Sequence, residues 1–212
     1  MDVTADTLLA ALLGYLCGSI PFGLILTRLA GMGDVRDIGS GNIGATNVLR
    51  TGNKWLAAAT LLLDLAKGFA AVMLAGRLIA PFDAQMHLHP LAGALEAVPV
   101  AALFAVLGHC FPVWLGFKGG KGVATNAGVS FGLAWPVGLA YALVWLGVLG
   151  LSRISSLAGM SAVVAAAIVA AVLGYTAFVP VLVLIALIVL WLHRENLKRL
   201  ANGTEPKVGS KG

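Results

Sequence analysis

Residues 154–193 read ISSLAGMSAVVAAAIVAAVLGYTAFVPVLVLIALIVLWLH, forty positions without a single Asp, Glu, Lys or Arg. A helix needs about 20 predominantly apolar residues to cross the hydrocarbon core of a bilayer, so this stretch is long enough for two crossings. Gly174-Tyr175 and Phe178-Val-Pro180 interrupt it near its middle. Glycine, proline and aromatic residues together are typical of turns at a membrane interface, and we therefore predict two spanning helices here.

Four more apolar blocks precede this stretch, at residues 7–27, 55–80, 97–117 and 122–152. Trp135-Pro136 divides the last of these into two short segments, each read as a span. The sequence therefore predicts an all-α polytopic integral membrane protein with about seven transmembrane helices. A five-span alternative stays open, in which both long blocks re-enter the membrane without crossing it.

The composition agrees with a membrane protein. Hydrophobic residues make up 59% of the 212 positions and charged residues only 11%, and the mean hydropathy is +0.95. A soluble domain carries about 25% charged residues, so water-soluble, disordered and fibrous classes are excluded. The net charge is +5, but the basic residues lie between apolar blocks, which indicates membrane topology and no nucleic-acid partner. The two cysteines lie inside apolar stretches and form no metal-ligand cluster.

The distribution of basic residues predicts the orientation. If the N-terminus is outside, twelve of the fourteen Lys and Arg fall in the inside segments 28–54, 117–121, 152–155 and 193–212. This satisfies the positive-inside rule. The first apolar segment has no basic region before it and is read as a retained span. We expect one transmembrane domain over 1–200 and a flexible cytoplasmic tail over 201–212.

Polar side chains gather in the inside segments, first in residues 36–50. Gly39, Gly41 and Gly44 let backbone N–H groups converge on an anion. The same segment carries the short polar side chains Ser40, Asn42, Thr46 and Asn47. It ends at Arg50, whose guanidinium can form two parallel hydrogen bonds to a phosphate. An ordinary connecting loop is the alternative, since such residues are common in turns.

The second polar segment is Gly116–Asn126, a glycine-rich turn that is expected to open a helix. It contains Gly119, Gly120 and Lys121, a combination that suits an oxyanion. It is no P-loop, because Leu115 and Gly122 stand where that motif needs glycine and Ser or Thr. The alternative is that the lysines of this segment only anchor the inside end of a span, as the positive-inside rule describes.

Two more polar segments follow. In the first, Ser155 and Ser156 either bind a ligand or cap the next helix. In the second, His193 and Asn196 share a helical face where the last span ends. An ordinary basic juxtamembrane helix is the alternative for the latter pair. Asp64 and Lys67, at i and i+3 within a span, are interpreted mainly as a helix-packing ion pair and alternatively as a substrate contact.

Missing sequence motifs exclude some classes of catalytic and metal site. The chain has no H-x-x-x-x-D acid-base pair. His87 and His89 lack a third metal ligand, so no metal site is expected. The residues favour a cytoplasmic site that binds phosphate esters beside the lipid. A transporter or channel for an organic phosphate is the alternative, and a purely structural subunit is a third reading.

Taken together, these segments resemble the bacterial acyl-phosphate:glycerol-3-phosphate acyltransferase family (PlsY). The resemblance covers nearly the whole chain. Its motifs are Gly18-Ser-Ile-Pro-Phe-Gly23, the Gly39–Arg50 loop, Asp64-Leu-Ala-Lys-Gly68, Gly108-His-Cys-Phe-Pro112, Gly119-Gly-Lys-Gly-Val-Ala-Thr125, Ser155-Ser156 and His193-Arg-Glu-Asn-Leu-Lys-Arg-Leu200.

The resemblance implies a seven-helix enzyme of the bacterial inner membrane that transfers an acyl group from acyl phosphate to the sn-1 hydroxyl of glycerol 3-phosphate. The products are lysophosphatidic acid and phosphate, without an acyl-enzyme and without a cofactor. It also implies transient contact with the soluble enzyme that makes acyl phosphate, and we expect a monomer.

Roles follow from the resemblance and from the chemistry of an activated anhydride, which needs no protein nucleophile. Ser40, Asn42 and Thr46, with the backbone of Gly41 and Gly44, are expected to cradle the acyl phosphate. The remaining polar residues are expected to hold glycerol 3-phosphate or the leaving phosphate, namely Arg50, Lys121, Ser155, Ser156, His193 and Asn196. Asn47, Gly119 and Gly120 are expected to complete substrate binding. The residues expected to be catalytic are Ser40, Arg50, Lys121 and His193, and either His193 or the leaving phosphate takes the proton.

Overall fold

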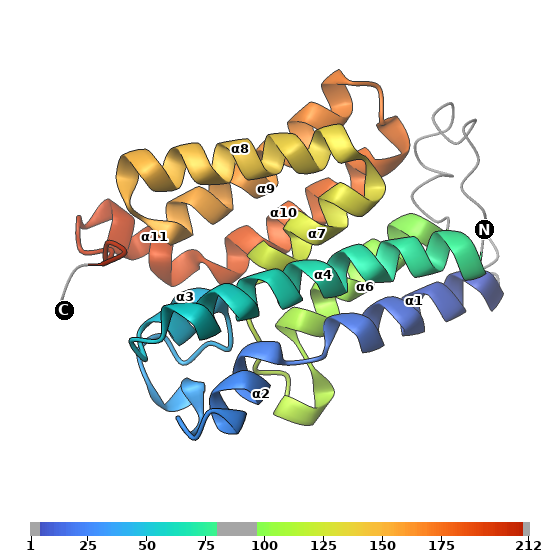
Figure 1. Ribbon diagram of the computed structural model, residues 1–212. Helices are drawn as coiled ribbons and strands as arrows, with labels where there is room; N and C mark the ends of the chain where they lie inside the picture. Colours follow the sequence, from blue (N-terminus) through green and yellow to red (C-terminus); the bar gives the residue numbers. More distant parts are fainter. Residues whose placement is uncertain (1–4, 80–96, 210–212) are drawn as a thin grey trace.

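The computed structural model describes residues 5–79 and 97–209, and the described residues are helical, without a strand (Figure 1). The predicted outer loop with His87 and His89 lies outside the described residues. In chain order the elements are α1 (Ala5–Gly18), α2 (Phe22–Leu29), η1 (Val35–Asp37), α3 (Ala45–Leu49), α4 (Lys54–Leu78), α6 (Ala97–Cys110), η3 (Val113–Leu115), α7 (Val123–Leu133), α8 (Trp135–Ser152), α9 (Ser155–Val172), η4 (Thr176–Phe178), α10 (Val179–Leu192) and α11 (Arg194–Ala201).

The breaks expected from the sequence are present. α8 begins at Trp135 with Pro136 in its first turn, and Gly174 has a φ of +82° between α9 and η4. Five described helical segments are long and apolar enough to cross a membrane, or six if the bent α10–α11 pair counts as one span. α7 has 11 residues, short of the ~20 that a straight crossing needs. The all-helical prediction is therefore confirmed, and the number of spans stays a prediction.

Glycines set how closely the helices pack. A methyl group on Gly14 or Gly18 of α1 would overlap the backbone of α6 at Ala101 or Ala105. A methyl group on Gly128 of α7 would in the same way overlap the backbone of α4 at Leu65. Small residues let backbones approach closely inside a membrane. Gly14-x-x-x-Gly18 and Gly128-x-x-x-Gly132 therefore serve close helix packing.

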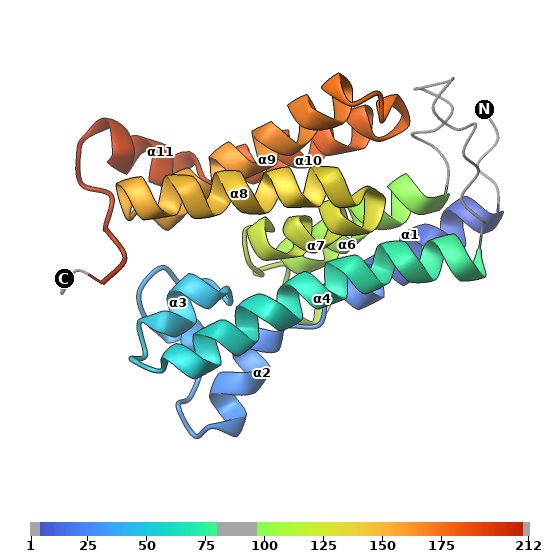
Figure 2. The same cartoon turned by 45° about the horizontal axis from the view of Figure 1, so that its top comes forward.

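The helices form two groups with α7 between them (Figure 2). α1, α4 and α6 make one group, and α8, α9 and α10 make the other. α7 contacts α4 and α6 on one side and α8 and α9 on the other. The buried core between them is built largely of small residues around Tyr141 and Phe178. Leu151 and Val172 on the outer faces are 91% and 77% exposed, as expected for side chains that contact lipid.

Two short helices, α3 and α11, lie at one end of the bundle. They lie together at the left end in Figures 1 and 2, and the described part of the chain begins with α1 at the opposite end. This end also receives residues 202–209, since Val208 N donates to Arg153 O at 2.7 Å. The flexibility of the tail 201–212 stays a prediction, but its described part contacts the bundle.

Candidate active site

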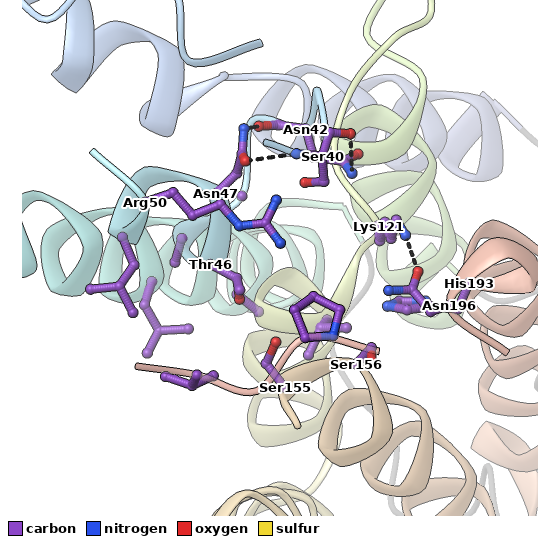
Figure 3. A pocket seen from close by; sticks show the side chains of 18 of the residues that line it. Ser40, Asn42, Thr46, Asn47, Arg50, Lys121, Ser155, Ser156, His193 and Asn196 are labelled. Atoms are coloured by element: carbon purple, nitrogen blue, oxygen red, sulfur yellow. Dashed lines mark hydrogen bonds between the residues drawn. The ribbon is translucent and has the colours of Figure 1, made fainter. Parts of the chain in front are cut away.

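A cavity of about 750 Å³ opens at this end of the bundle and brings the four polar segments together (Figure 3). Most of the predicted site residues line it: Ser40, Asn42, Gly44, Thr46, Asn47, Arg50, Lys121, Ser155, Ser156, His193 and Asn196. Gly41, Gly119 and Gly120 do not line it and lie in the backbone next to lining residues. Segments up to 156 residues apart in sequence thus share one site.

The 36–50 loop is braced by Asn47, which is buried. Its amide nitrogen lies 2.7 Å from Val35 O, 2.8 Å from Asn42 O and 3.2 Å from Ile38 O, and its Oδ1 accepts from Ser40 N at 3.1 Å. All of these bonds are made to the loop itself. Asn47 therefore fixes the loop conformation that presents Ser40 to the cavity.

Glycine is required at two positions of this loop. Gly39 and Gly41 have φ values of +56° and +67°, in the left-handed region that favours glycine. A methyl group on Gly39 would also crowd Arg50 and Asn47. The guanidinium of Arg50 therefore lies across the turn, where Figure 3 shows it pointing into the cavity.

Lys121 enters the cavity from the turn before α7. Gly122, with φ +85°, precedes the first residue of that helix, and Lys121 Nζ donates to Asn196 Oδ1 on α11. Burial lowers the pKa of the Lys121 ammonium, and the neighbouring cation of Arg199 adds to the effect. The prediction that the glycine-rich turn opens a helix is confirmed.

His193 lies between α10 and α11 and is 4% exposed. Its Nδ1 lies 2.8 Å from Val189 O. A carbonyl oxygen only accepts, so Nδ1 carries the proton and Nε2 keeps its lone pair. Burial lowers the pKa of His193 to about 4, so the ring is neutral near pH 7 and Nε2 can accept a proton.

Glu205 was not among the predicted site residues, yet it lines the cavity. Its carboxylate accepts from Ser156 Oγ and Asn196 Nδ2, both at 2.6 Å, and from Arg199 Nε at 2.7 Å. Burial raises the pKa of this carboxyl, but the three hydrogen bonds outweigh it and leave the pKa below its usual value. A single carboxylate after a basic helix was the only sequence signal for it.

The ion pair expected within α4 is present. Lys67 Nζ lies 2.7 Å from Asp64 Oδ1 and also donates to Ile20 O at 2.7 Å. Asp64 also lines the cavity, and so does His109, which sequence reasoning did not select as a site residue. Leu61 of α4 and Trp145 of α8 give it an apolar wall between the two helix groups. The site thus combines anion-binding groups with an apolar surface.

Comparison with known proteins agrees with this arrangement. The family model described as glycerol-3-phosphate acyltransferase matches residues 8–203. The chain is 63% identical to the glycerol-3-phosphate acyltransferase of Erythrobacter litoralis and 66% identical to that of Novosphingobium aromaticivorans, each over 211 residues and the full length of both chains.

Two solved structures share the fold. Both are crystal structures of PlsY (YgiH), an integral membrane glycerol 3-phosphate acyltransferase. The glycerol 3-phosphate form matches with a TM-score of 0.85 at 36% identity, and the lysophosphatidic acid form with 0.83 at 35%. Each match covers 97% of this chain and 96% of the other. This chain therefore belongs to the glycerol-3-phosphate acyltransferase (PlsY) family of integral membrane proteins.

Proposed function

We propose that this glycerol-3-phosphate acyltransferase takes its acyl group from acyl phosphate and transfers it directly to the sn-1 hydroxyl of glycerol 3-phosphate. The observation that supports this most is one cavity with two sets of anion-binding groups and an apolar wall. Two substrates that each carry a phosphate, one of them with an acyl chain, need that combination.

The two sets suit different phosphates. The loop with Ser40, Asn42, Gly41, Gly44 and Thr46 holds the acyl phosphate, and its chain leaves along Leu61 and Trp145. The facing groups hold glycerol 3-phosphate and receive the leaving phosphate, namely Arg50, Lys121, Ser155, Ser156 and Asn196. Preorganised cations and hydroxyls of this kind stabilise charge that develops in the transition state.

The transfer needs no covalent enzyme intermediate. The sn-1 oxygen attacks the acyl carbonyl carbon, a new ester C–O bond forms, and the bond from that carbon to the phosphate oxygen breaks. Inorganic phosphate leaves with the electron pair, and the hydroxyl proton goes to His193 Nε2 or to the leaving phosphate. The neutral state of His193, with a pKa of about 4, supports the first route.

The membrane arrangement is part of the proposal. Seven helices cross the bacterial inner membrane, the N-terminus lies outside, and the site faces the cytoplasm, where both substrates are available. The protein acts as a monomer without a metal or cofactor and contacts the soluble enzyme that supplies acyl phosphate only transiently. The predominance of Lys and Arg in the inside segments supports this orientation.

The test is an assay of the purified protein in lipid with labelled glycerol 3-phosphate and either palmitoyl phosphate or palmitoyl-CoA. We expect lysophosphatidic acid from the acyl phosphate only, and its loss in Lys121→Ala. Lys118→Ala is the matched control, because Lys118 is exposed on the same turn and does not line the cavity.

Three other results of this assay would contradict parts of the proposal. Product from palmitoyl-CoA would show that the donor is misassigned. A trapped acyl group on any Ser, Thr or Cys would refute direct transfer. Binding of glycerol 3-phosphate without product from either donor would favour the transporter alternative.

A further inference from the structure

Two buried residues of the cavity wall have no part in the proposed reaction, Asp64 on α4 and His109 near the end of α6. Their side chains are 2% and 3% exposed. Asp64 Oδ1 lies 3.6 Å from His109 Nδ1, too far for a hydrogen bond but close enough for a carboxylate to favour a ring orientation that turns Nδ1 toward it.

The carboxylate is itself held by Lys67, whose ammonium is anchored in turn. Lys67 Nζ lies 2.7 Å from Asp64 Oδ1, and the same ammonium donates to Ile20 O just after α1. Asp64 is therefore fixed relative to both α1 and α4. If the Asp64 side chain changed rotamer, the buried Lys67 ammonium would lose its counter-ion, which is costly in this environment.

The other edge of the His109 ring faces the turn that carries Lys121. A methyl group on Gly120 would overlap His109 Nε2 and lie close to other ring atoms. The main chain continues this contact, since Gly120 N donates to His109 O at 3.0 Å and Gly119 N donates to Cys110 O at 3.1 Å. Both the ring and the backbone of His109 thus hold the residue before Lys121.

This support matters because Gly119 and Gly120 make their main-chain N–H hydrogen bonds to α6 rather than within the turn. Gly116, Phe117 and Gly122 have positive φ values of +59°, +62° and +85°, so the turn has no regular backbone conformation. The side chain of Lys121 has one hydrogen bond, to Asn196, a residue that is itself expected to contact substrate. A long flexible lysine needs a fixed backbone if its ammonium is to meet a phosphate reproducibly.

We propose that Asp64 and His109 are positioning residues for Lys121. The carboxylate orients the imidazole, and the imidazole holds the Gly119–Gly120 backbone so that the ammonium reaches the phosphate of glycerol 3-phosphate. The proposal rests on the proposed function for the identity of that phosphate. It differs from a helix-packing role, in which the cluster would affect both substrates alike.

The test is a double-mutant cycle between His109 and Lys121. Binding of glycerol 3-phosphate is measured by calorimetry without any acyl donor. We expect His109→Ala to weaken this binding by about 10- to 100-fold in the presence of Lys121. In the Lys121→Ala background the same change should cost no more than about twofold, because the residue through which it acts is gone.

Kinetics give a second readout that a packing role would not produce. His109→Ala and Asp64→Asn should raise KM for glycerol 3-phosphate and leave KM for palmitoyl phosphate unchanged. His109→Gln keeps more of the side-chain volume and serves if His109→Ala does not fold. Ser130→Ala is the control, because Ser130 is a buried polar residue of α7 outside the cavity lining and should leave both KM values unchanged.

Equal rises in both KM values, or the same loss of affinity with and without Lys121, would overturn the proposal. So would unchanged affinity in His109→Ala. A wild-type protein that binds glycerol 3-phosphate but makes no product would refute the proposed function alone, since the binding cycle uses no donor and still decides the role of His109.

Discussion

At the scale of single residues, the site depends on which atoms carry protons. His193 presents a neutral ring whose Nδ1 donates to Val189 O, so only Nε2 is available as a base. Glu205 presents a carboxylate that three donors hold in its charged form. Both side chains have partners within the protein before any substrate arrives, and such preorganisation lowers the cost of reaching the transition state.

The pH dependence of kcat tests the role of His193. Its pKa of about 4 means that the base is unprotonated above that pH and is protonated, and therefore inactive, below it. We expect kcat to fall as the pH drops through about 4, with no limb near the ordinary histidine value of about 6.5. Stopped assays over a pH series measure this.

His193→Gln separates the two proton routes. Glutamine keeps a hydrogen-bonding amide but accepts no proton at neutral pH. If His193 is the general base, kcat should fall by about 10² to 10⁴. Retention of most of the activity would show that the leaving phosphate takes the proton and that His193 only orients the substrate.

Glu205→Gln should reduce acid sensitivity of the fold. The pKa of Glu205 is lowered in the folded protein, so its contribution to stability is present above the ordinary value of 4.5 and is lost as the pH falls through the lowered pKa. We expect the unfolding temperature of the wild type to drop more steeply below pH 4.5 than that of the variant. Thermal melts of both proteins in detergent over a pH series measure this. The same pH dependence of the unfolding temperature in the two proteins would contradict a stabilising role of the Glu205 carboxylate.

At the scale of helices, the close packing of α1 on α6 depends on the absence of side chains. Gly18→Ala would force a methyl group into the backbone at Ala105 and should destabilise the protein by about 1–3 kcal/mol. Gly147→Ala on α8 is the matched control, because beyond its chain neighbours and the backbone of its own helix no atom lies within 4 Å of the added methyl group. Thermal unfolding of both variants checks this, and an equal effect of the two would contradict it.

At the scale of the whole molecule, the two ends of the bundle should face opposite sides of the membrane. Leu173 lies at the end of α9, and Asn202 follows α11 beside the cavity end. In a variant without the native cysteines, Leu173→Cys should react with a membrane-impermeant maleimide in spheroplasts, whereas Asn202→Cys should react only after permeabilisation. The reverse labelling would invert the proposed topology.

The sequence by itself determined the helical class, the breaks before Trp135 and around Gly174, and the polar segments that line the cavity. Hydropathy and turn chemistry are local properties, so a few neighbouring residues are enough to read them. Ser40, Lys121 and His193 were found in the same way, as polar residues next to glycines or at the end of an apolar run.

Only the tertiary structure decided which of these residues meet. Glu205 reaches Ser156 across 49 positions, and His109 lies near Asp64 from another helix, so neighbouring residues in the sequence do not reveal either partner. Asn47 was predicted to bind substrate, whereas the hydrogen bonds of its amide in the structure brace the loop from within. Contacts between distant segments depend on how helix faces pack, and here glycine-mediated packing of α1 on α6 and of α7 on α4 sets that arrangement.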